Sequence, residues 1–473
     1  MHYCSTRGSV KGWNFEQVLF SGFAPDGGLL MPEKIPELNL ATLQRWSKFN
    51  YVELVKEICS VFISSEDIPH NDLSDLIDKA FCHFQLKEVV HLSKLKDGIN
   101  VLELWHGPTM AFKDLGMLCL GQFLKYFLKK NGLQATIVVG TSGDTGSAAI
   151  ESVRGMNGVD IIVVYPKGRC TKVQELQMTT VMEDNVHVFE ADGTSDDIDV
   201  ILRKLFADLA FVKEHVLMST NSINWFRILV QMAHFFYGYF QCVSPQEVSS
   251  LPPLEMVVPT GGAGNITAGC IAVKMGLPLR IVSTVNENDI IFRTIKHGDF
   301  SLASSVKHTL APAIDIQDPY NMERIFWLFS EMDNKLIKVM MEEFQSTGKI
   351  KLQDRLHSKI SKIISSCSVK DDVIIQTMKR CWKENHYLLC PHTAVAVSYH
   401  YKNPPSHQRR CFLATASAAK FQEVLKQAGL PLEIPEKISA LETKQTQKIS
   451  MQKSANWESI LREKIKLIQM RRH

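Results

Sequence analysis

The sequence lacks any apolar run of the about 18 residues that a membrane span requires. Its longest apolar stretches, such as residues 161–165, have only the length of a strand. The N-terminus has neither a basic segment followed by an apolar core nor the long Arg- and Ser-rich stretch of an organelle transit peptide. We therefore expect a cytoplasmic protein with no membrane partner.

Cysteine motifs and an excess of one charge are also lacking. The eleven cysteines are scattered and form no C-x-x-C pair, which indicates reduced thiols and predicts neither a disulfide framework nor a metal site. The net charge is only +3, so electrostatics give no reason to expect nucleic-acid binding. With 45% apolar and 22% charged residues, the composition is that of a folded globular protein.

The 473 residues suffice for two to four domains or lobes. After a helical start, apolar strands are predicted at residues 101–105, 135–140, 161–165, 186–190, 255–258, 279–285 and 411–415, and helical patterns separate most of them. This alternation predicts an α/β fold with open, mostly parallel sheets. Residues 340–388 are predicted to be helical and polar.

Two clusters of such strands predict two lobes with a ligand cleft between them. We divide the chain into an N-terminal helical extension packed on the large lobe, a smaller α/β lobe, a large α/β lobe and a C-terminal helical tail. The corresponding residues are 1–95, 96–220, 221–430 and 431–473.

The most informative segment is residues 106–114, HGPTMAFKD. It follows a predicted strand, and Phe112 and Leu115 make the surroundings of Lys113 apolar. A lysine removed from water has a lowered pKa and can act as an amine nucleophile and base. Taken alone, a lysine beside an aspartate also fits a surface ion pair.

A second segment, residues 258–265 (VPTGGAGN), follows a predicted strand and precedes a helix. Glycines at such a place let backbone amides approach a phosphate. The dinucleotide fingerprint is excluded because Thr267 occupies the position of its third glycine, and a Walker A loop is excluded because no Gly-Lys-Ser/Thr follows. The segment suits a single phosphate, although a turn without a ligand would show the same pattern.

Two further segments follow predicted strands. Residues 140–147 (GTSGDTGS) offer hydroxyls and amides that suit a carboxylate, or simply cap a helix after a tight turn. In residues 414–421 (ATASAAKF), Thr415 ends a strand, where its hydroxyl could meet a ring nitrogen. A reactive lysine, a one-phosphate loop, a carboxylate loop and a ring-nitrogen partner together predict a site for pyridoxal 5′-phosphate holding an amino acid.

These segments resemble the threonine synthase family, and in particular its threonine synthase-like branch. Residues 106–114 match the family's cofactor-lysine motif, HGPT-x-AFKD, and the resemblance covers roughly residues 3–425. The other matching segments are residues 5–8 (STRG), 26–29 (DGGL), 142–146 (SGDTG), 166–168 (PKG), 221–227 (NSINWFR), 286–289 (NEND) and 391–394 (PHTA). The resemblance implies a fold-type II pyridoxal-phosphate enzyme that acts on small O-phosphorylated amino acids, as a homodimer or a monomer.

The resemblance also implies roles for individual residues. Lys113 would hold the cofactor covalently, and Thr415 would face its pyridine nitrogen. The residues implied to cradle its phosphate are Gly261, Gly262, Ala263, Gly264 and Asn265. Those implied at the substrate are Ser142, Asp144 and Thr145 at its carboxylate and the cofactor hydroxyl, and Lys167, Asn224 and Arg227 at its phosphate.

The reaction that this resemblance favours is a carbon–oxygen lyase reaction on a phosphate ester. O-phosphothreonine or O-phosphohomoserine would give 2-oxobutyrate, ammonia and phosphate. Two features favour it: the branch of the family, and residues 262–265 (GAGN), where many family members read NFGD. Threonine synthesis from O-phosphohomoserine is the alternative, and a signalling form of the same scaffold with little catalytic activity is a second.

Overall fold

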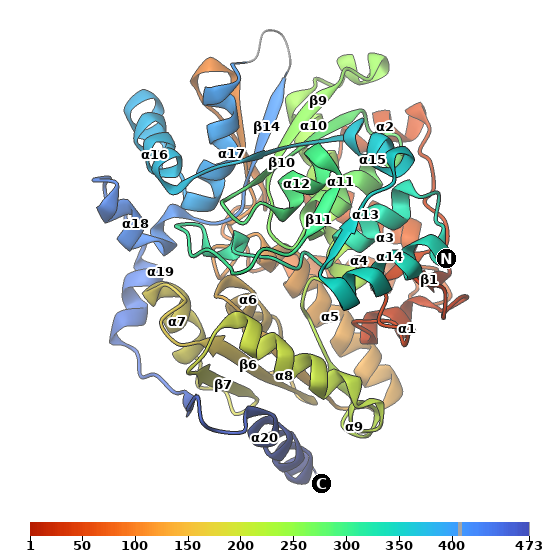
Figure 1. The fold of residues 1–473 in the computed structure, drawn as a ribbon, viewed down its shortest axis with the longest axis vertical. Coiled ribbons are helices and arrows are strands. Elements are labelled where there is room, and N and C mark those ends of the chain that lie inside the picture. The colour runs from red at the N-terminus through yellow and green to blue at the C-terminus, as the bar shows by residue number, and fades with distance from the viewer. Residues whose placement is uncertain (405–408, 473) are drawn as a thin grey trace.

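Two separate sheets organise the fold, and the computed structural model describes residues 1–404 and 409–472 (Figure 1). In order across the large sheet, the strands are β13 (Ile364–Ser368), β10 (Leu279–Val285), β9 (Leu254–Pro259), β14 (Arg410–Ala414), β4 (Ile99–Glu103) and β3 (His91–Lys94). The smaller sheet contains β15 (Ile449–Met451), β7 (Val186–Ala191), β6 (Val159–Pro166), β5 (Ala135–Gly140) and β8 (Leu217–Met218). All neighbouring strands in both sheets are parallel except the pair β3 and β4.

Helices connect and cover these strands, as the alternation in the sequence predicts. The α-helices up to residue 242 are α1 (Phe15–Phe20), α2 (Leu40–Trp46), α3 (Tyr51–Phe62), α4 (His70–Phe81), α5 (Lys113–Asn131), α6 (Asp144–Val153), α7 (Lys172–Thr179), α8 (Ser195–Ala207), α9 (Leu209–Glu214) and α10 (Trp225–Cys242). Those that follow are α11 (Gly264–Lys274), α12 (Ile290–His297), α13 (Met322–Phe329), α14 (Asn334–Thr347), α15 (Asp354–Ser361), α16 (Asp371–Asn385), α17 (Pro391–Lys402), α18 (Gln422–Gln427), α19 (Glu436–Ser439) and α20 (Trp457–Arg472). Short pairs β1 (Tyr3–Ser5) with β2 (Leu30–Pro32) and β11 (Asp299–Ser301) with β12 (Lys349–Lys351) complete the regular structure.

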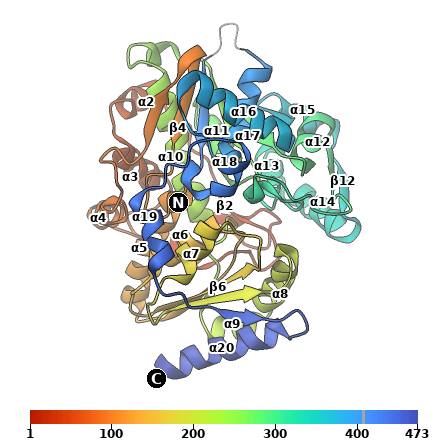
Figure 2. The same cartoon turned by 90° about the vertical axis from the view of Figure 1, so that its left-hand side faces the viewer.

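The smaller sheet separates two apolar cores. Because side chains alternate along a strand, Ile137 and Val139 of β5 join the main core of the molecule, whereas Val138 faces the other side. There it meets apolar residues of α8 and α20, which include Ile198 and Leu461. Figure 2 shows α20 on the outside of this lobe, with the C-terminus at its end. A sheet buried on both faces explains the continuous apolar run of β5.

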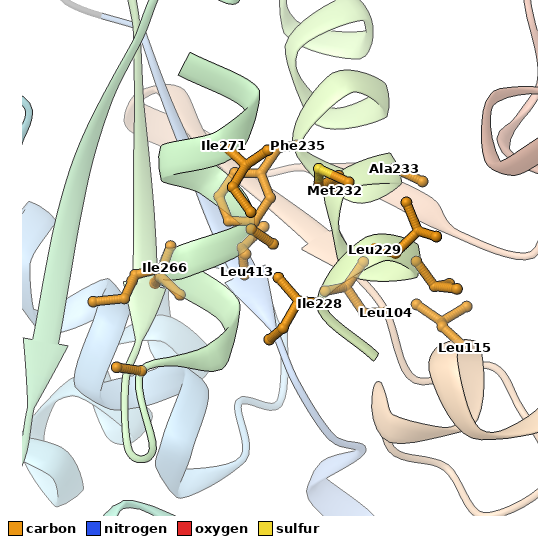
Figure 3. Packing of buried hydrophobic residues seen from close by; sticks show 14 of the residues in the cluster. Leu104, Leu115, Ile228, Leu229, Met232, Ala233, Phe235, Ile266, Ile271 and Leu413 are labelled. Carbon is orange, nitrogen blue, oxygen red and sulfur yellow. The ribbon is translucent and has the colours of Figure 1, made fainter. Parts of the chain in front are cut away.

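Helix α10 lies at the centre of the main core. Every residue from 225 to 240 is buried, and most of these residues are apolar. Figure 3 shows Ile228 and Phe235 on the side toward α11, and Leu229 on the side toward Leu115 of α5. Helix α3 of the N-terminal segment packs against α10 as well, and α4 packs against α5. The segments that carry the lysine and the glycine loop therefore share one rigid support.

Three sequence predictions about organisation are wrong in part. The boundary at residue 96 assigned β4 to the smaller lobe, but β4 pairs with β14 in the large sheet. Residues 340–388 contain not only helices but also β12 and the edge strand β13, whose sequence ISSCS carries little apolar signal. The tail at 431–473 is not wholly helical, since β15 extends the smaller sheet beside β7. Strand β4 was predicted but assigned to the wrong sheet, and β12, β13 and β15 were missed; each placement depends on a pairing partner distant in the chain.

Among the described residues, no helix combines the length and apolar character that crossing a membrane would require.

The contact between α5 and α6 gives a stability prediction. A Cβ atom on Gly121 would lie 2.2 Å from the carbonyl oxygen of Ser152, which is backbone and cannot move away easily. Gly121→Ala should therefore lower the free energy of unfolding by about 1–3 kcal/mol in a denaturant titration. Gly116→Ala on the same helix is the control, because its nearest neighbours lie 3.9 Å away. That variant should be neutral or more stable by up to about 1 kcal/mol, and equal losses in both would contradict the packing argument.

Candidate active site

The loop between β4 and α5 brings Lys113 to the carboxyl end of the large sheet. Lys113 lies after the strand, as predicted, and is the first residue of α5, although β4 ends at Glu103, two residues earlier than expected. The loop is joined to the segment after β14 by two backbone hydrogen bonds. The N–H of Phe112 donates to the carbonyl of Thr415 (2.8 Å), and the N–H of Ser417 donates to that of Met110 (3.1 Å). Two segments that the sequence separates by about 300 residues thus form one wall of the site.

The amine of Lys113 reaches across to the loop before α6. Its Nζ donates to Oγ1 of Thr145 at 2.7 Å. The pKa of Lys113 is lowered to about 8, mainly by burial and also by the nearby Arg227 and Lys420, while Asp144 acts in the opposite direction. A substantial fraction of the neutral amine is therefore present near neutral pH, as a nucleophile or base requires.

Asp144 forms a buried ion pair with Lys420. Its Oδ1 lies 2.6 Å from Nζ of Lys420 and accepts from Nε2 of Gln174 at 2.9 Å. Burial by itself would raise the pKa of this carboxyl, but Lys420 and Lys113 lower it to about 2. Asp144 is therefore an internal anion paired with Lys420, and its place at the substrate carboxylate or the cofactor hydroxyl stays a prediction.

The glycine loop between β9 and α11 is shaped to hold an anion. A Cβ atom on Gly261 would lie 2.6 Å from the carbonyl oxygen of Ala313, so only glycine fits there. Ala263 adopts a left-handed conformation (φ 61°) at the start of α11. Among the described residues, the amides of residues 261–263 have no hydrogen-bond partner. Gly262 and Gly264 complete this cradle of free backbone donors, which suits one phosphate.

Asn265 adds a side-chain donor to the same loop. Its Oδ1 accepts from Nε2 of His234 at 2.7 Å, whereas its buried Nδ2 has no partner. Burial lowers the pKa of His234 to about 4, so this imidazole is neutral and brings no charge to the loop. An unpaired buried amide is costly in a folded protein, and a bound phosphate would supply its acceptor. The loop as a whole fits the phosphate of pyridoxal 5′-phosphate.

Three other predicted residues lie at strand ends with free side chains. Thr415 follows β14 and is buried, Ser142 lies half-buried in the loop before α6, and Lys167 is exposed after β6. None of the three side chains has a hydrogen-bond partner among the residues that the structure describes. These side chains are available to a ligand: Thr415 offers a neutral hydroxyl, and Lys167 offers a cation at the surface.

The two remaining predictions, Asn224 and Arg227, differ in outcome. Asn224 caps α10: its Oδ1 accepts from the N–H of Phe226 (3.0 Å) and its Nδ2 donates to the carbonyl of Leu19 (2.9 Å). Both polar atoms of this amide thus bond to the backbone, and its place at the substrate phosphate stays a prediction. Arg227 is buried, donates from Nη1 to the carbonyl of Thr220 (3.2 Å) and has no partner for Nε. Burial lowers its pKa only to about 10, so it is a cation with an unused donor.

Sequence reasoning assigned no role to two buried residues of the site. Lys420 lies within the segment ATASAAKF, and a lysine among small and apolar residues after a strand was the available signal. His392 lies in the segment PHTA at the start of α17, and its Nε2 accepts from the N–H of Ala313 at 3.1 Å. His392 therefore holds the backbone at Ala313, whose carbonyl oxygen packs against Gly261.

Comparison with known proteins agrees with this geometry. Residues 2–81 match the family described as the threonine synthase N terminus, and residues 86–353 match the pyridoxal-phosphate dependent enzymes. Threonine synthase-like 2 of Xenopus laevis is 58% identical over the whole of both chains. The chain belongs to the threonine synthase-like family.

More distant relatives share the complete architecture of this threonine synthase-like protein. Threonine synthase of Saccharomyces cerevisiae is 36% identical over 90% of this chain and 88% of its own. The crystal structure of threonine synthase from Brucella melitensis with bound pyridoxal phosphate superposes with a TM-score of 0.91 at 32% identity, and 99% of each chain is covered. The predicted fold-type II architecture and the predicted cofactor are confirmed.

The free amide of Asn265 gives a test of the cofactor site. Asn265→Ala in this threonine synthase-like protein should weaken the binding of pyridoxal 5′-phosphate about 10- to 100-fold, because a hydrogen bond to a charged group is lost. The dissociation constant is measured by titrating the cofactor-free protein and following absorbance. Lys274→Ala, an exposed change at the other end of α11, is the control and should bind as the wild type does. Equal affinities of the wild type and Asn265→Ala would remove this residue from the site.

The lowered pKa of Lys113 predicts a pH dependence of stability. Without cofactor, the folded protein holds this lysine with a pKa of about 8 instead of the ordinary 10.5. Below pH 8 the charge is present and buried, which destabilises the fold; between about 8 and 10.5 the folded state loses its proton first, and stability rises with pH. Lys113→Met should therefore be more stable than the wild type by about 2 kcal/mol at pH 7.

This difference in unfolding free energy should shrink as the pH approaches 10.5. Denaturant titrations of both proteins from pH 6.5 to 10.5 measure it. Lys125→Met, an exposed change on the same helix, is the control and should show a constant difference. A difference between Lys113→Met and the wild type that did not vary with pH would contradict the lowered pKa.

Proposed function

We propose that the protein is a lyase that removes phosphate from small O-phosphorylated amino acids and releases 2-oxobutyrate and ammonia. The observation that carries this proposal is a half-buried lysine with a lowered pKa, Lys113, beside a buried guanidinium, Arg227, that has an unused donor. The amine can take a proton, and the cation can hold a departing phosphate. A base and a fixed cation are what elimination of a phosphate ester requires.

Each residue of the site has a defined task in this reaction. The loop at residues 261–265 and Thr415 would hold the cofactor, which when bound supplies an electron sink for charge that develops at the substrate's α-carbon. Lys113 Nζ, held by Oγ1 of Thr145 at 2.7 Å, takes the α-proton. Arg227 then stabilises the leaving phosphate, with Lys167 at the surface as a second cation. Ser142 would orient the carboxylate of the substrate.

The products follow by balance of atoms. Loss of phosphate from the β-carbon of O-phosphothreonine leaves an enamine, which takes up one water and gives 2-oxobutyrate and ammonia. O-phosphohomoserine carries its phosphate one carbon further away, so a proton must also leave the β-carbon before phosphate departs. The same three products result. Thr415 at the ring nitrogen is neutral and would not hold the ring as a cation, which suits short elimination better than longer sequences of steps.

Threonine synthesis is the second candidate, and the 36% identity to a threonine synthase over most of both chains favours it. The first steps would be the same, but water would add to the β-carbon before the product left. Two observations support the lyase over the synthase. The identity to threonine synthase-like 2, at 58%, is much higher than to the synthase. The glycine loop reads GAGN, so it holds its anion mainly with backbone donors.

Product analysis decides between the two reactions. Cofactor-saturated protein is incubated separately with O-phosphothreonine and O-phosphohomoserine, and phosphate, 2-oxobutyrate and threonine are measured. We expect equal amounts of phosphate and 2-oxobutyrate and no threonine. Threonine from O-phosphohomoserine would establish the synthase instead, and no product from either substrate would contradict both and favour the signalling form.

Two variants separate catalysis from contamination. Lys113→Ala should reduce the rate at least 10²-fold, because the base is lost. Lys125→Ala, an exposed lysine on the same helix, should keep the wild-type rate.

A further inference from the structure

A second lysine is buried in this site, and the reaction described above does not use it. Lys420 has no exposed surface. It lies at the end of a short 3₁₀ helix (Ala418–Lys420) that follows β14, and Ala418 and Ala419 beside it are also buried. Burying an ammonium group is unfavourable unless it is paired and hydrogen-bonded. The contacts of Lys420 therefore indicate why it is retained there.

Lys420 joins three segments that carry the site. Its Nζ lies 2.6 Å from Oδ1 of Asp144, at the start of α6. The same Nζ donates to the carbonyl of Thr109 (2.7 Å), in the loop that leads to Lys113. Thr109 in turn binds Asp114 through its N–H (2.8 Å) and its Oγ1 (2.5 Å). One ammonium thus ties the loops before α5 and α6 to the end of β14.

We propose that Lys420 is a positioning residue whose buried ammonium aligns these loops and, by neutralising Asp144, favours the reactive, unprotonated form of the Lys113 amine. It does not touch the reacting atoms in this proposal. The inference rests on the role proposed for Lys113, and it assigns to Lys420 a function beyond packing.

The charges around Lys113 support the role of Lys420 as a positioning residue and of Lys113 as the reactive amine. Burial, Arg227 and Lys420 all lower its pKa, whereas Asp144 and Cys170 raise it. His392 nearby has its pKa lowered to about 4 by burial and is neutral, whereas burial raises the pKa of Asp114, the residue after Lys113, to about 7. Asp144 is the anion that most raises the pKa of Lys113, and unpaired it would hold the proton on that amine. Because Lys420 binds the carboxylate directly, that attraction is partly cancelled.

Competitive labelling of the cofactor-free, full-length protein tests the proposal without measuring activity. Limiting acetic anhydride reacts only with neutral amines, and mass spectrometry of the peptide that contains Lys113 gives the labelling midpoint against pH. The wild type should have its midpoint at about 8. Lys420→Met should raise the midpoint by about one pH unit or more, because Asp144 is then unpaired.

Lys420→Arg keeps the charge and should restore a midpoint near that of the wild type. Lys426→Met, an exposed lysine six residues along the same segment, is the matched control and should leave the midpoint unchanged. A purely structural Lys420 would alter stability but not the midpoint. The same midpoint in Lys420→Met and the wild type would therefore overturn the proposal.

A second comparison applies if Lys420→Met does not fold because Asp144 is left as an unpaired buried charge. Asp144→Asn and the double variant Asp144→Asn with Lys420→Met leave no such anion. The double variant removes both members of the neutralised pair, so its Lys113 midpoint should stay near that of the wild type, and a midpoint shifted by one pH unit or more would overturn the proposal.

Failure of the underlying role of Lys113 has a different signature. Lys113→Ala should abolish covalent attachment of the cofactor, detected by mass spectrometry after borohydride reduction. Attachment that survives in Lys113→Ala would overturn the proposed function itself. Attachment at Lys113 together with a midpoint independent of Lys420 would overturn only the present inference.

Discussion

The buried ion pair between Lys420 and Asp144 is the constraint on which the rest of the site depends. A reactive lysine must be removed from water to lose its proton near neutral pH, and removal from water makes every neighbouring charge costly. The protein satisfies this requirement by pairing Asp144 with Lys420 and with the amide of Gln174. Lys113 then occupies a place where cations and burial together outweigh a single anion.

The fold supplies the rigidity that such a site requires. Lys113, the glycine loop and Thr415 all follow strands of the large sheet, so their positions relative to one another are set by strand pairing. Asp144 and Thr145 come from the smaller sheet, and the contacts of Lys113 and Lys420 with them join the two lobes at the site. Helix α10 supports two of these segments, because α5, which begins at Lys113, and α11, which follows the glycine loop, both pack against it. A small change in the distance between the lobes would therefore alter the contacts of the Lys113 amine.

The same site can serve a lyase or a synthase because the two reactions share their first steps. Both require a base at the α-carbon, a cation at the leaving phosphate and a neutral partner at the ring nitrogen. What separates them is whether water is held beside the substrate until it adds. Identity to synthases and the proposed lyase activity are therefore compatible.

The sequence by itself determined the parallel sheets and the functional segments, because buried parallel strands appear as short apolar runs and their ligand loops follow directly. Lys113, the glycine loop and Thr415 were placed in this way. Only the tertiary structure decided that β4 belongs to the large sheet, that Asn224 is a helix cap and that Asp144 pairs with Lys420. Each of these depends on a partner distant in the chain, and strand pairing and charge pairing act through space, so that no local pattern records them.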